Sequence, residues 1–277
     1  MRFFNPIKNS YYFHDKVWVI LEEDKLDSPV WHSLEETHQP FSLSYEGARF
    51  YDPSYCPFGS FQSDKKSEFI TREYSALCSR FYIVGDEPRC SDGLTINENN
   101  ICNQMIIKHS PSLKVTESIV ELSHTEQKQE LIKLVNLVQP GFIKEKTPSL
   151  GAYFGIYKNN SLVAVAGERM KMNRFTEISA VVTHQQYARN GYAKQLLKHL
   201  VDTILMQEKI PYLHVSETNI KAIKLYHSFG FTSRRKISFW HIVKSNMWHL
   251  EIIFYRTRIC ILDHDLLTLN WWSINAF

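Results

Sequence analysis

Residues 175–205 read FTEISAVVTHQQYARNGYAKQLLKHLVDTIL, and the fold class follows from this stretch. Its first part, Phe175–Thr183, is rich in β-forming side chains and predicts a strand. From Ala193 to Leu205 apolar side chains recur at helical spacing, so a helix with one buried face is predicted. Gly191 stands between the two. A strand, a tight turn and a long helix together predict an α/β protein.

The sequence before this stretch predicts further strands and a helix. Residues 153–157 and 162–168 are rich in β-forming residues and are joined by a short polar segment, which predicts a β-hairpin. Residues 115–122 predict another strand. Ser123 and Glu126 have the spacing of a capping box, so a helix is expected to begin there.

The sequence after the stretch continues the alternation. Residues 211–215 predict a short strand, and a helix should run from Asn219 to a terminating Gly230. Residues 231–243 can form two strands joined by a turn at 233–236. The complete order is β-α-β-β-β-α-β-α-β-β, in which the central β-α-β unit should be parallel.

Composition limits the class of protein. The 277 residues include 32 Lys and Arg against 29 Asp and Glu, a net charge of +3, and 44% are hydrophobic. These values indicate a globular protein of two parts and give no sign of nucleic-acid binding. The five cysteines form no Cys-x-x-Cys pair, so neither a zinc site nor a disulfide framework is predicted. Without a signal peptide or an apolar run of roughly 20 residues, the chain is expected to be cytoplasmic and free of the membrane.

The turn Tyr187–Ala193 is the strongest candidate for a binding site. Glycine lets the backbone turn tightly, so several amides can point into one concavity. The N-terminus of the following helix adds the positive end of its dipole, and this combination suits a pyrophosphate. The alternative, from the residues alone, is an ordinary strand-to-helix turn.

Three segments carry a family resemblance: GAYFGIYKNNSLVAVAGERM (151–170), EISAVVTHQQYARNGYAKQLLKHL (177–200) and PYLHVSETNIKAIKLYHSFGF (211–231). Together they resemble the GNAT superfamily of acyl-CoA-dependent N-acetyltransferases. The resemblance covers residues 120–243 and is closest to the branch related to the C-terminal half of glycine N-acyltransferase. It implies the GNAT fold, an α/β (α+β) arrangement of a mixed central sheet with helices on both faces.

The resemblance also implies a division of the chain. Residues 1–110 resemble a degenerate GNAT-like N-terminal lobe, 111–244 the acetyltransferase domain, and 245–277 a tail of unknown role. The N-terminal lobe lacks a Gly-x-Gly/Ala turn, so it is expected to select the acceptor and to bind no second cofactor. Within it, the polar stretch 93–100 predicts a loop.

Acetyl-CoA is the co-substrate that the resemblance implies. Amides of the turn would hold the pyrophosphate, and strand backbone would hold the pantetheine arm, as an exposed strand edge accepts a ligand's amides. The family's usual Arg or Gln at the first turn position is replaced by Ala188. The alternatives are buried packing for Val181 and Val182 and a helix N-cap for Asn219. The implied cofactor-binding residues are Val181, Val182, Thr183, Arg189, Asn190, Gly191, Tyr192, Ala193 and Asn219.

Two residues match the family's catalytic positions. Tyr226 would protonate the leaving thiolate, and Glu177, which strand alternation places on one face with Ser179 and Val181, would deprotonate the amine. Glu168 is the reserve base. The alternative for Tyr226 is a core tyrosine, and for either glutamate it is a solvated or salt-bridged residue at a strand edge. Direct attack needs no nucleophilic cysteine, and the histidines at 184, 214 and 227 lack metal-ligand spacing, so no metal is predicted.

The predicted activity is therefore transfer of an acetyl group from acetyl-CoA to a primary amine by direct attack. The acceptor is expected to be a small molecule or a peptide amine, and the protein a monomer or homodimer. The alternative is a catalytically silent GNAT-fold module that binds CoA or another protein.

Overall fold

The computed structural model describes residues 22–62 and 67–245. Its strands are β1 (Ser42–Tyr45), β2 (Ala48–Tyr51), β3 (Phe58–Phe61), β4 (Arg80–Val84), β5 (Leu94–Ile106), β6 (Ile119–Glu121), β7 (Tyr153–Lys158), β8 (Ser161–Lys171), β9 (Phe175–Thr183), β10 (Ile210–Ser216) and β11 (Thr232–Lys244). Its α-helices are α2 (Pro29–Glu35), α3 (Ser67–Ser75), α4 (Thr125–Val138), α5 (Tyr192–Met206) and α6 (Ile220–Phe229). Short 3-10 turns are η1 (Asp24–Asp27), η2 (Gln39–Phe41), η4 (Thr147–Ser149) and η5 (Gln185–Tyr187).

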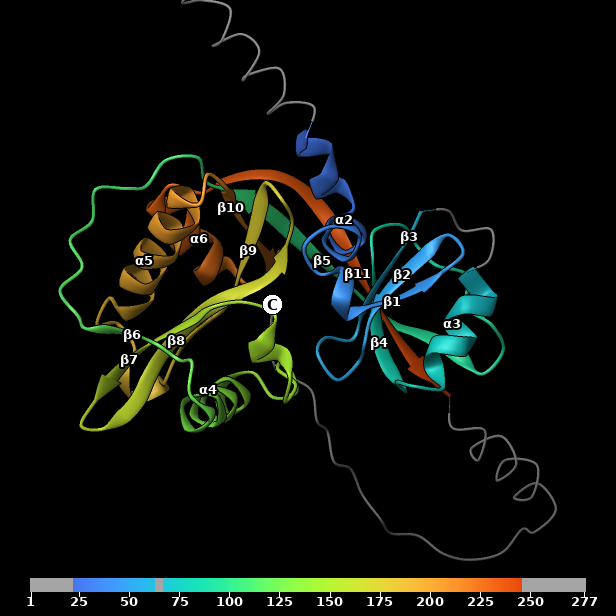
Figure 1. The fold of residues 1–277 in the computed structure, drawn as a ribbon, viewed down its shortest axis with the longest axis horizontal. Helices are drawn as coiled ribbons and strands as arrows, with labels where there is room; N and C mark the ends of the chain where they lie inside the picture. The colour runs from blue at the N-terminus through green and yellow to red at the C-terminus, as the bar shows by residue number, and fades with distance from the viewer. Residues whose placement is uncertain (1–21, 63–66, 246–277) are drawn as a thin grey trace, which may run out of the picture.

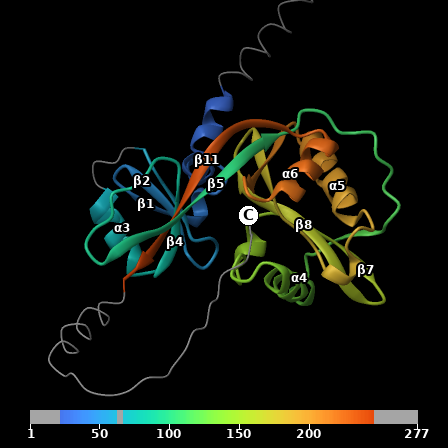
Figure 2. The ribbon, with the colours of Figure 1, turned by 180° about the vertical axis from the view of Figure 1, so that it is seen from behind.

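The described strands form one sheet in the order β1-β2-β3-β4-β11-β5-β10-β9-β8-β7-β6. Strands β1–β4 with α2 and α3 lie in one lobe, and β6–β10 with α4, α5 and α6 lie in the other (Figure 1). The long strands β5 and β11 run through both lobes, as the view from behind also shows (Figure 2). They pair antiparallel with each other, while β5 also pairs with β10 and β11 with β4. Backbone hydrogen bonds therefore connect the two lobes.

Helices cover both faces of the sheet around β8 and β9. On one face α5 buries Leu196 and Leu200 against Ile178, and α6 packs beside it. On the other face α4 buries Val135 against Val182. This arrangement confirms the predicted mixed sheet with helices on both faces.

The N-terminal lobe packs on the face opposite to α5. There α2 buries Val30 and Leu34 in one core with Met170, Phe175 and Tyr212 from β8, β9 and β10. Since these strands also carry the predicted site, the lobe forms part of its surroundings. The division of the chain into separate domains stays a prediction.

Several predicted elements are confirmed. The hairpin is β7 and β8, which pair antiparallel, and the strand at Phe175–Thr183 is β9. The helix after Gly191 is α5, and it connects β9 to a parallel β10. The helix from Asn219 is α6, which ends at Gly230 in the left-handed conformation.

Other expectations were wrong. Residues 231–243 form no hairpin, because β11 pairs with β5 along its whole length. The charged run begins at a bulge between Ser233 and Arg235, within this strand. Residues 94–100 are the first half of β5, and among the described residues they pair only with β11. Most of their side chains are exposed or half-buried, which accommodates the polar residues. Residues 115–122 contribute only the short β6.

The start of α4 also differs from the expectation. Its N-cap is His124, one residue after the predicted Ser123, and the His124 amide donates to the Gln127 side chain.

Two expectations concern regions that are only partly described. Among residues 22–62 and 67–245, no helix has both the length and the apolar character of a membrane span. The predicted tail lies outside the described residues apart from Ser245. Its role and the cytoplasmic location stay predictions.

Candidate functional site

The turn between β9 and α5 is open and rich in unusual backbone geometry. Arg189 and Gly191 both have positive φ angles, +68° and +76°. Residues 188–191 are exposed, and a Cβ added to Gly191 would meet no atom within 4 Å. Among the described residues, the amides of 189–191 have no acceptor, and the first amides of α5 lack partners as at any helix start. Such a turn offers N–H groups to an anion.

Strands β9 and β10 are paired over only part of their lengths. Their parallel ladder consists of Ile210↔Phe175, Pro211↔Thr176 and Tyr212↔Glu177. Beyond that point β9 stays paired with β8 as far as Thr183, and β10 stays paired with β5 as far as Ser216. Within the described part of the chain, the facing backbone edges of the two strands are therefore unpaired next to the open turn.

A bulge in β9 accompanies this separation. Between Ser179 and Val182 the strand has one residue more than β8 has between Val165 and Gly167, and Ala180 takes a φ of +51°. The bulge interrupts strand alternation. As a result Val181 packs toward the α5–α6 core, while the side chain of Glu177 lies on the opposite face.

The prediction that Glu177, Ser179 and Val181 share one face was therefore wrong. Regular alternation holds only where the ladder is regular, and the bulge lies between Glu177 and Val181. Val182 packs against α4 and Thr183 is half-buried at the end of β9.

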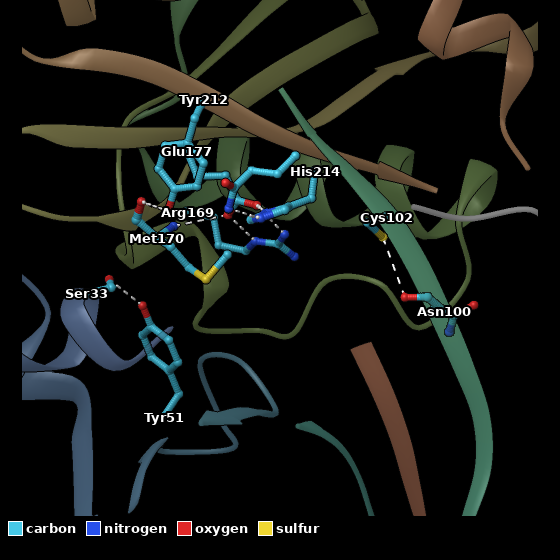
Figure 3. Close-up of polar contacts among 10 residues, drawn as sticks. Ser33, Tyr51, Asn100, Cys102, Arg169, Met170, Glu177, Tyr212 and His214 are labelled. Carbon is cyan, nitrogen blue, oxygen red and sulfur yellow. Dashed lines mark hydrogen bonds and ion pairs between the residues drawn. The ribbon is translucent and has the colours of Figure 1, made fainter. Parts of the chain in front are cut away.

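The carboxylate of Glu177 is buried and fully hydrogen-bonded (Figure 3). Its Oε1 accepts from Arg169 Nη2 at 2.8 Å and from His214 Nδ1 at 2.8 Å. Its Oε2 accepts from Arg169 Nε at 2.8 Å and from the Met170 amide at 3.3 Å. A carboxylate has about four acceptor positions, so none is left free.

Electrostatics keeps this carboxylate ionised. Burial alone would raise the pKa of Glu177, but the charge and hydrogen bonds of Arg169, with help from His214, lower it to about 2. The guanidinium of Arg169 in turn lies over the rings of Phe58 and Phe142, at 4.8 and 5.5 Å from their centroids. Proton transfer to Glu177 would require one of its four contacts to open.

Glu168 on β8 differs in one respect. Its side chain is only 1% exposed, and its Oε2 accepts from Lys171 Nζ at 2.5 Å and from the Ala152 amide at 3.2 Å. Its Oε1 is buried, and no partner for it is found among residues 22–62 and 67–245. Of the two candidate bases, Glu168 therefore has the unused acceptor oxygen.

Tyr226 lies on the opposite side of the sheet from Glu177. It projects from α6 into the α5–α6 core and meets Phe231 edge-on, with ring centroids 5.8 Å apart. Burial raises the pKa of Tyr226, and no hydrogen bond to its hydroxyl is found among the described residues. The phenol is therefore neutral and keeps its proton for donation.

Known proteins with a similar sequence or fold indicate the family to which this geometry is related. A family model described as FR47-like protein matches residues 153–240. A GNAT-family acetyltransferase from Novosphingobium aromaticivorans is similar in structure, with 29% identity, a TM-score of 0.71, and 80% of this chain and 99% of that chain covered. The chain has the fold of the GNAT acetyltransferases.

A GCN5-related N-acetyltransferase from Kribbella flavida shares the GNAT fold at 11% identity, with a TM-score of 0.53 and coverage of 79% of this chain and 94% of that chain. A search of curated proteins gave no match. These similarities support acyl transfer in general. They do not single out the glycine N-acyltransferase branch.

The remaining predicted residues of the GNAT site lie at helix starts. Asn219 is the N-cap of α6, and its Oδ1 accepts from the Ala222 amide at 3.1 Å, so the structural alternative is realised. Tyr192 is buried in the α5–α6 core and Ala193 is half-buried behind the turn. Among the described residues no group of three metal-ligating side chains is found.

Sequence reasoning missed Arg169 and left His214 without a specific partner. A signal for Arg169 existed, since it follows Glu168 at the end of the mostly apolar run SLVAVAGERM, on the strand predicted to precede that of Glu177. Opposite charges on neighbouring strands predict a pair. No comparable local signal linked His214 on β10 to either residue.

Proposed function

We propose that the protein is an acyl-CoA-dependent N-acyltransferase that moves an acetyl group from acetyl-CoA to a primary amine. One observation carries the proposal: the unpaired edges of β9 and β10 open directly beside the exposed turn at the start of α5. These two features offer backbone amides and carbonyls to a pantetheine arm and amides to a pyrophosphate, in that order along one surface.

In the proposed complex the amides of residues 189–193 hold the pyrophosphate. The backbone of Val181, Val182 and Thr183 hydrogen-bonds the pantetheine amides. Because backbone groups do this work, Ala188 in place of a larger polar residue is compatible with binding. The cap uses only the side-chain oxygen of Asn219, and its side-chain nitrogen has no partner among the residues that the structure describes, so it is available to the ligand.

The proposed reaction is direct attack of a neutral amine on the thioester carbonyl. A C–N bond forms, the C–S bond breaks, and the Tyr226 hydroxyl donates a proton to the departing thiolate. The proton lost by the amine goes to a carboxylate, either Glu177 after one contact opens or Glu168 through its free oxygen.

The acceptor is proposed to be a small molecule or a peptide amine, bound where the N-terminal lobe meets the acetyltransferase lobe. Side chains fix this junction: Ser33 Oγ donates to the Lys171 carbonyl at 2.9 Å, and Thr147 Oγ1 donates to the Tyr55 carbonyl at 2.6 Å. A site between lobes is a common position for a ligand.

A catalytically silent CoA-binding module is the second candidate. The observation in its favour is that both candidate bases are buried and ion-paired. Calorimetry with CoA, followed by thiol release from acetyl-CoA with a panel of amines, separates the two. Binding with turnover supports the enzyme, binding without turnover supports the module, and absence of binding contradicts both.

A further inference from the structure

A directional chain of hydrogen bonds leads from the N-terminal lobe to Glu177. Arg234 Nη1 donates to Gln104 Oε1 at 3.0 Å, which identifies the other end of that amide as nitrogen. Gln104 Nε2 then donates to the Leu26 carbonyl at 2.7 Å and to His214 Nε2 at 3.1 Å. His214 must accept at Nε2, so its proton is on Nδ1, which donates to Glu177 at 2.8 Å.

The position of this chain in the sheet is specific. Tyr212↔Glu177 is the last backbone pair between β10 and β9, and His214 is the next residue of β10 on the same face. The bond from His214 to Glu177 thus links the two strands by side chains where backbone pairing ends. Arg169 and the Met170 amide fasten the same carboxylate to β8.

The group is buried and satisfied. The side chains of Arg169, Glu177 and His214 are 7%, 1% and 1% exposed, and Gln104 is fully buried. None of their buried nitrogen or oxygen atoms lacks a partner. Burying an ion pair gives little net stability compared with apolar packing, so a role in fixing geometry accounts better for the arrangement.

We infer that His214 and Gln104 are positioning residues that, through Glu177, set where and how far β9 and β10 separate, and so prepare the opening for the acyl-pantetheine arm. This inference rests on the proposed function for the ligand. It assigns the Glu177 cluster a role in binding the acyl donor, with no proton transfer at His214. It also connects the carbonyl of Leu26 in the N-terminal lobe to that opening.

Two substitutions of one residue test the inference in the full-length protein. His214→Asn keeps an N–H donor near the Nδ1 position and its bond to Glu177. His214→Gln keeps an acceptor near the Nε2 position for Gln104 and loses the bond to Glu177. We expect His214→Gln to weaken CoA binding about tenfold and to raise the KM for acetyl-CoA, as loss of one hydrogen bond to a charged group implies. His214→Asn should stay within about twofold of the natural protein, because an amide N–H donates to Glu177 without Gln104 having to set its tautomer.

Several readouts distinguish positioning from other roles. The pH profile of kcat should be unchanged in both variants, and amide hydrogen exchange in residues 213–216, measured without CoA, should be faster only in His214→Gln. Equal CoA affinity and equal exchange in the two variants would overturn the inference. So would a shifted pH profile with an unchanged KM, which would indicate proton transfer. If His214→Gln does not fold, Gln104→Leu is measured by the same readouts.

The outcome also separates this inference from the proposed function. If the natural protein fails to bind CoA, the proposed function is wrong. If it binds CoA and both His214 variants bind equally well, only the positioning role is wrong.

Discussion

At the scale of single residues, the chemistry depends on which polar atoms already have partners. All acceptor positions of Glu177 are taken, whereas one buried oxygen of Glu168 has no partner in the part of the chain that the structure describes. Burial raises the pKa of the Tyr226 hydroxyl. A buried polar atom without a partner is costly, so Glu168 Oε1 is a position where a water or an ammonium group would be favourable.

Tyr226 can be tested with a substitution that removes one atom. Tyr226→Phe keeps the ring and its contact with Phe231, so the fold and CoA affinity should persist. If the hydroxyl protonates the thiolate, turnover should fall by about 10²-fold or more, measured as thiol release at saturating acetyl-CoA. Unchanged turnover would leave Tyr226 as a packing residue.

Replacing Glu177 or Glu168 by glutamine should lower the free energy of unfolding by different amounts. Glu177→Gln leaves the Arg169 guanidinium buried without its counter-charge, so the free energy of unfolding should fall by about 3–5 kcal/mol. Glu168→Gln is the matched control. Its partner Lys171 is 20% exposed and can turn toward water, so the loss should be about 1 kcal/mol. Urea denaturation of both variants measures this, and equal losses would contradict the argument.

At the scale of secondary-structure elements, local patterns in the sequence predicted most of the lobe that contains β6–β10 and α4–α6. Apolar periodicity was sufficient for α5, and the Gly191 turn was visible because glycine is needed at its positive φ. The bulge in β9 was not visible, since Ala180 occupies the left-handed conformation without glycine. A pattern with a period of two therefore failed at the bulge beside the opening.

The turn before α5 has a natural control for its test. Gly191 and Gly141 have φ values of +76° and +78°, and neither would bring a Cβ within 4 Å of another atom. Valine at either position costs similar backbone strain, about 1–2 kcal/mol. Only Gly191→Val places bulk on the turn proposed to hold the pyrophosphate. We expect CoA affinity, measured by calorimetry, to fall at least about tenfold for Gly191→Val and to be unchanged for Gly141→Val.

The comparison of these two folded variants removes the effect of strain. Equal CoA affinity in Gly191→Val and Gly141→Val would show that the pyrophosphate does not lie on the α5 turn.

At the scale of the whole molecule, the two lobes share one sheet through β5 and β11 (Figures 1 and 2). These strands are far apart in the sequence, and their register is set by pairing with each other, so local patterns could not reveal it. The charged run at Arg234 looked like a turn because its partner Asp27 comes from the other lobe. Contacts between distant segments are the part of the fold, and of the site, that the sequence alone did not provide.

One such contact predicts that the stability of the protein depends on pH. His38 is 2% exposed, its Nε2 donates to the Leu150 carbonyl at 2.9 Å, and its Nδ1 lies 2.9 Å from the Tyr51 hydroxyl. Burial lowers the pKa of His38 from 6.5 to about 4. Below pH 6.5 the unfolded chain therefore binds a proton that the folded protein does not, and stability is lost as the pH falls toward 4.

Between pH 7 and pH 5 this linkage should reduce the free energy of unfolding by about 2 kcal/mol. His38→Gln supplies an amide that can donate to the Leu150 carbonyl and does not titrate, so its stability should change less over the same interval. Urea denaturation of both proteins at pH 7, 6 and 5 measures the difference, in a range where few carboxylates titrate. If the free energy of unfolding falls equally in the two proteins, protonation of His38 does not cause the loss of stability at low pH. Another buried group must then be responsible.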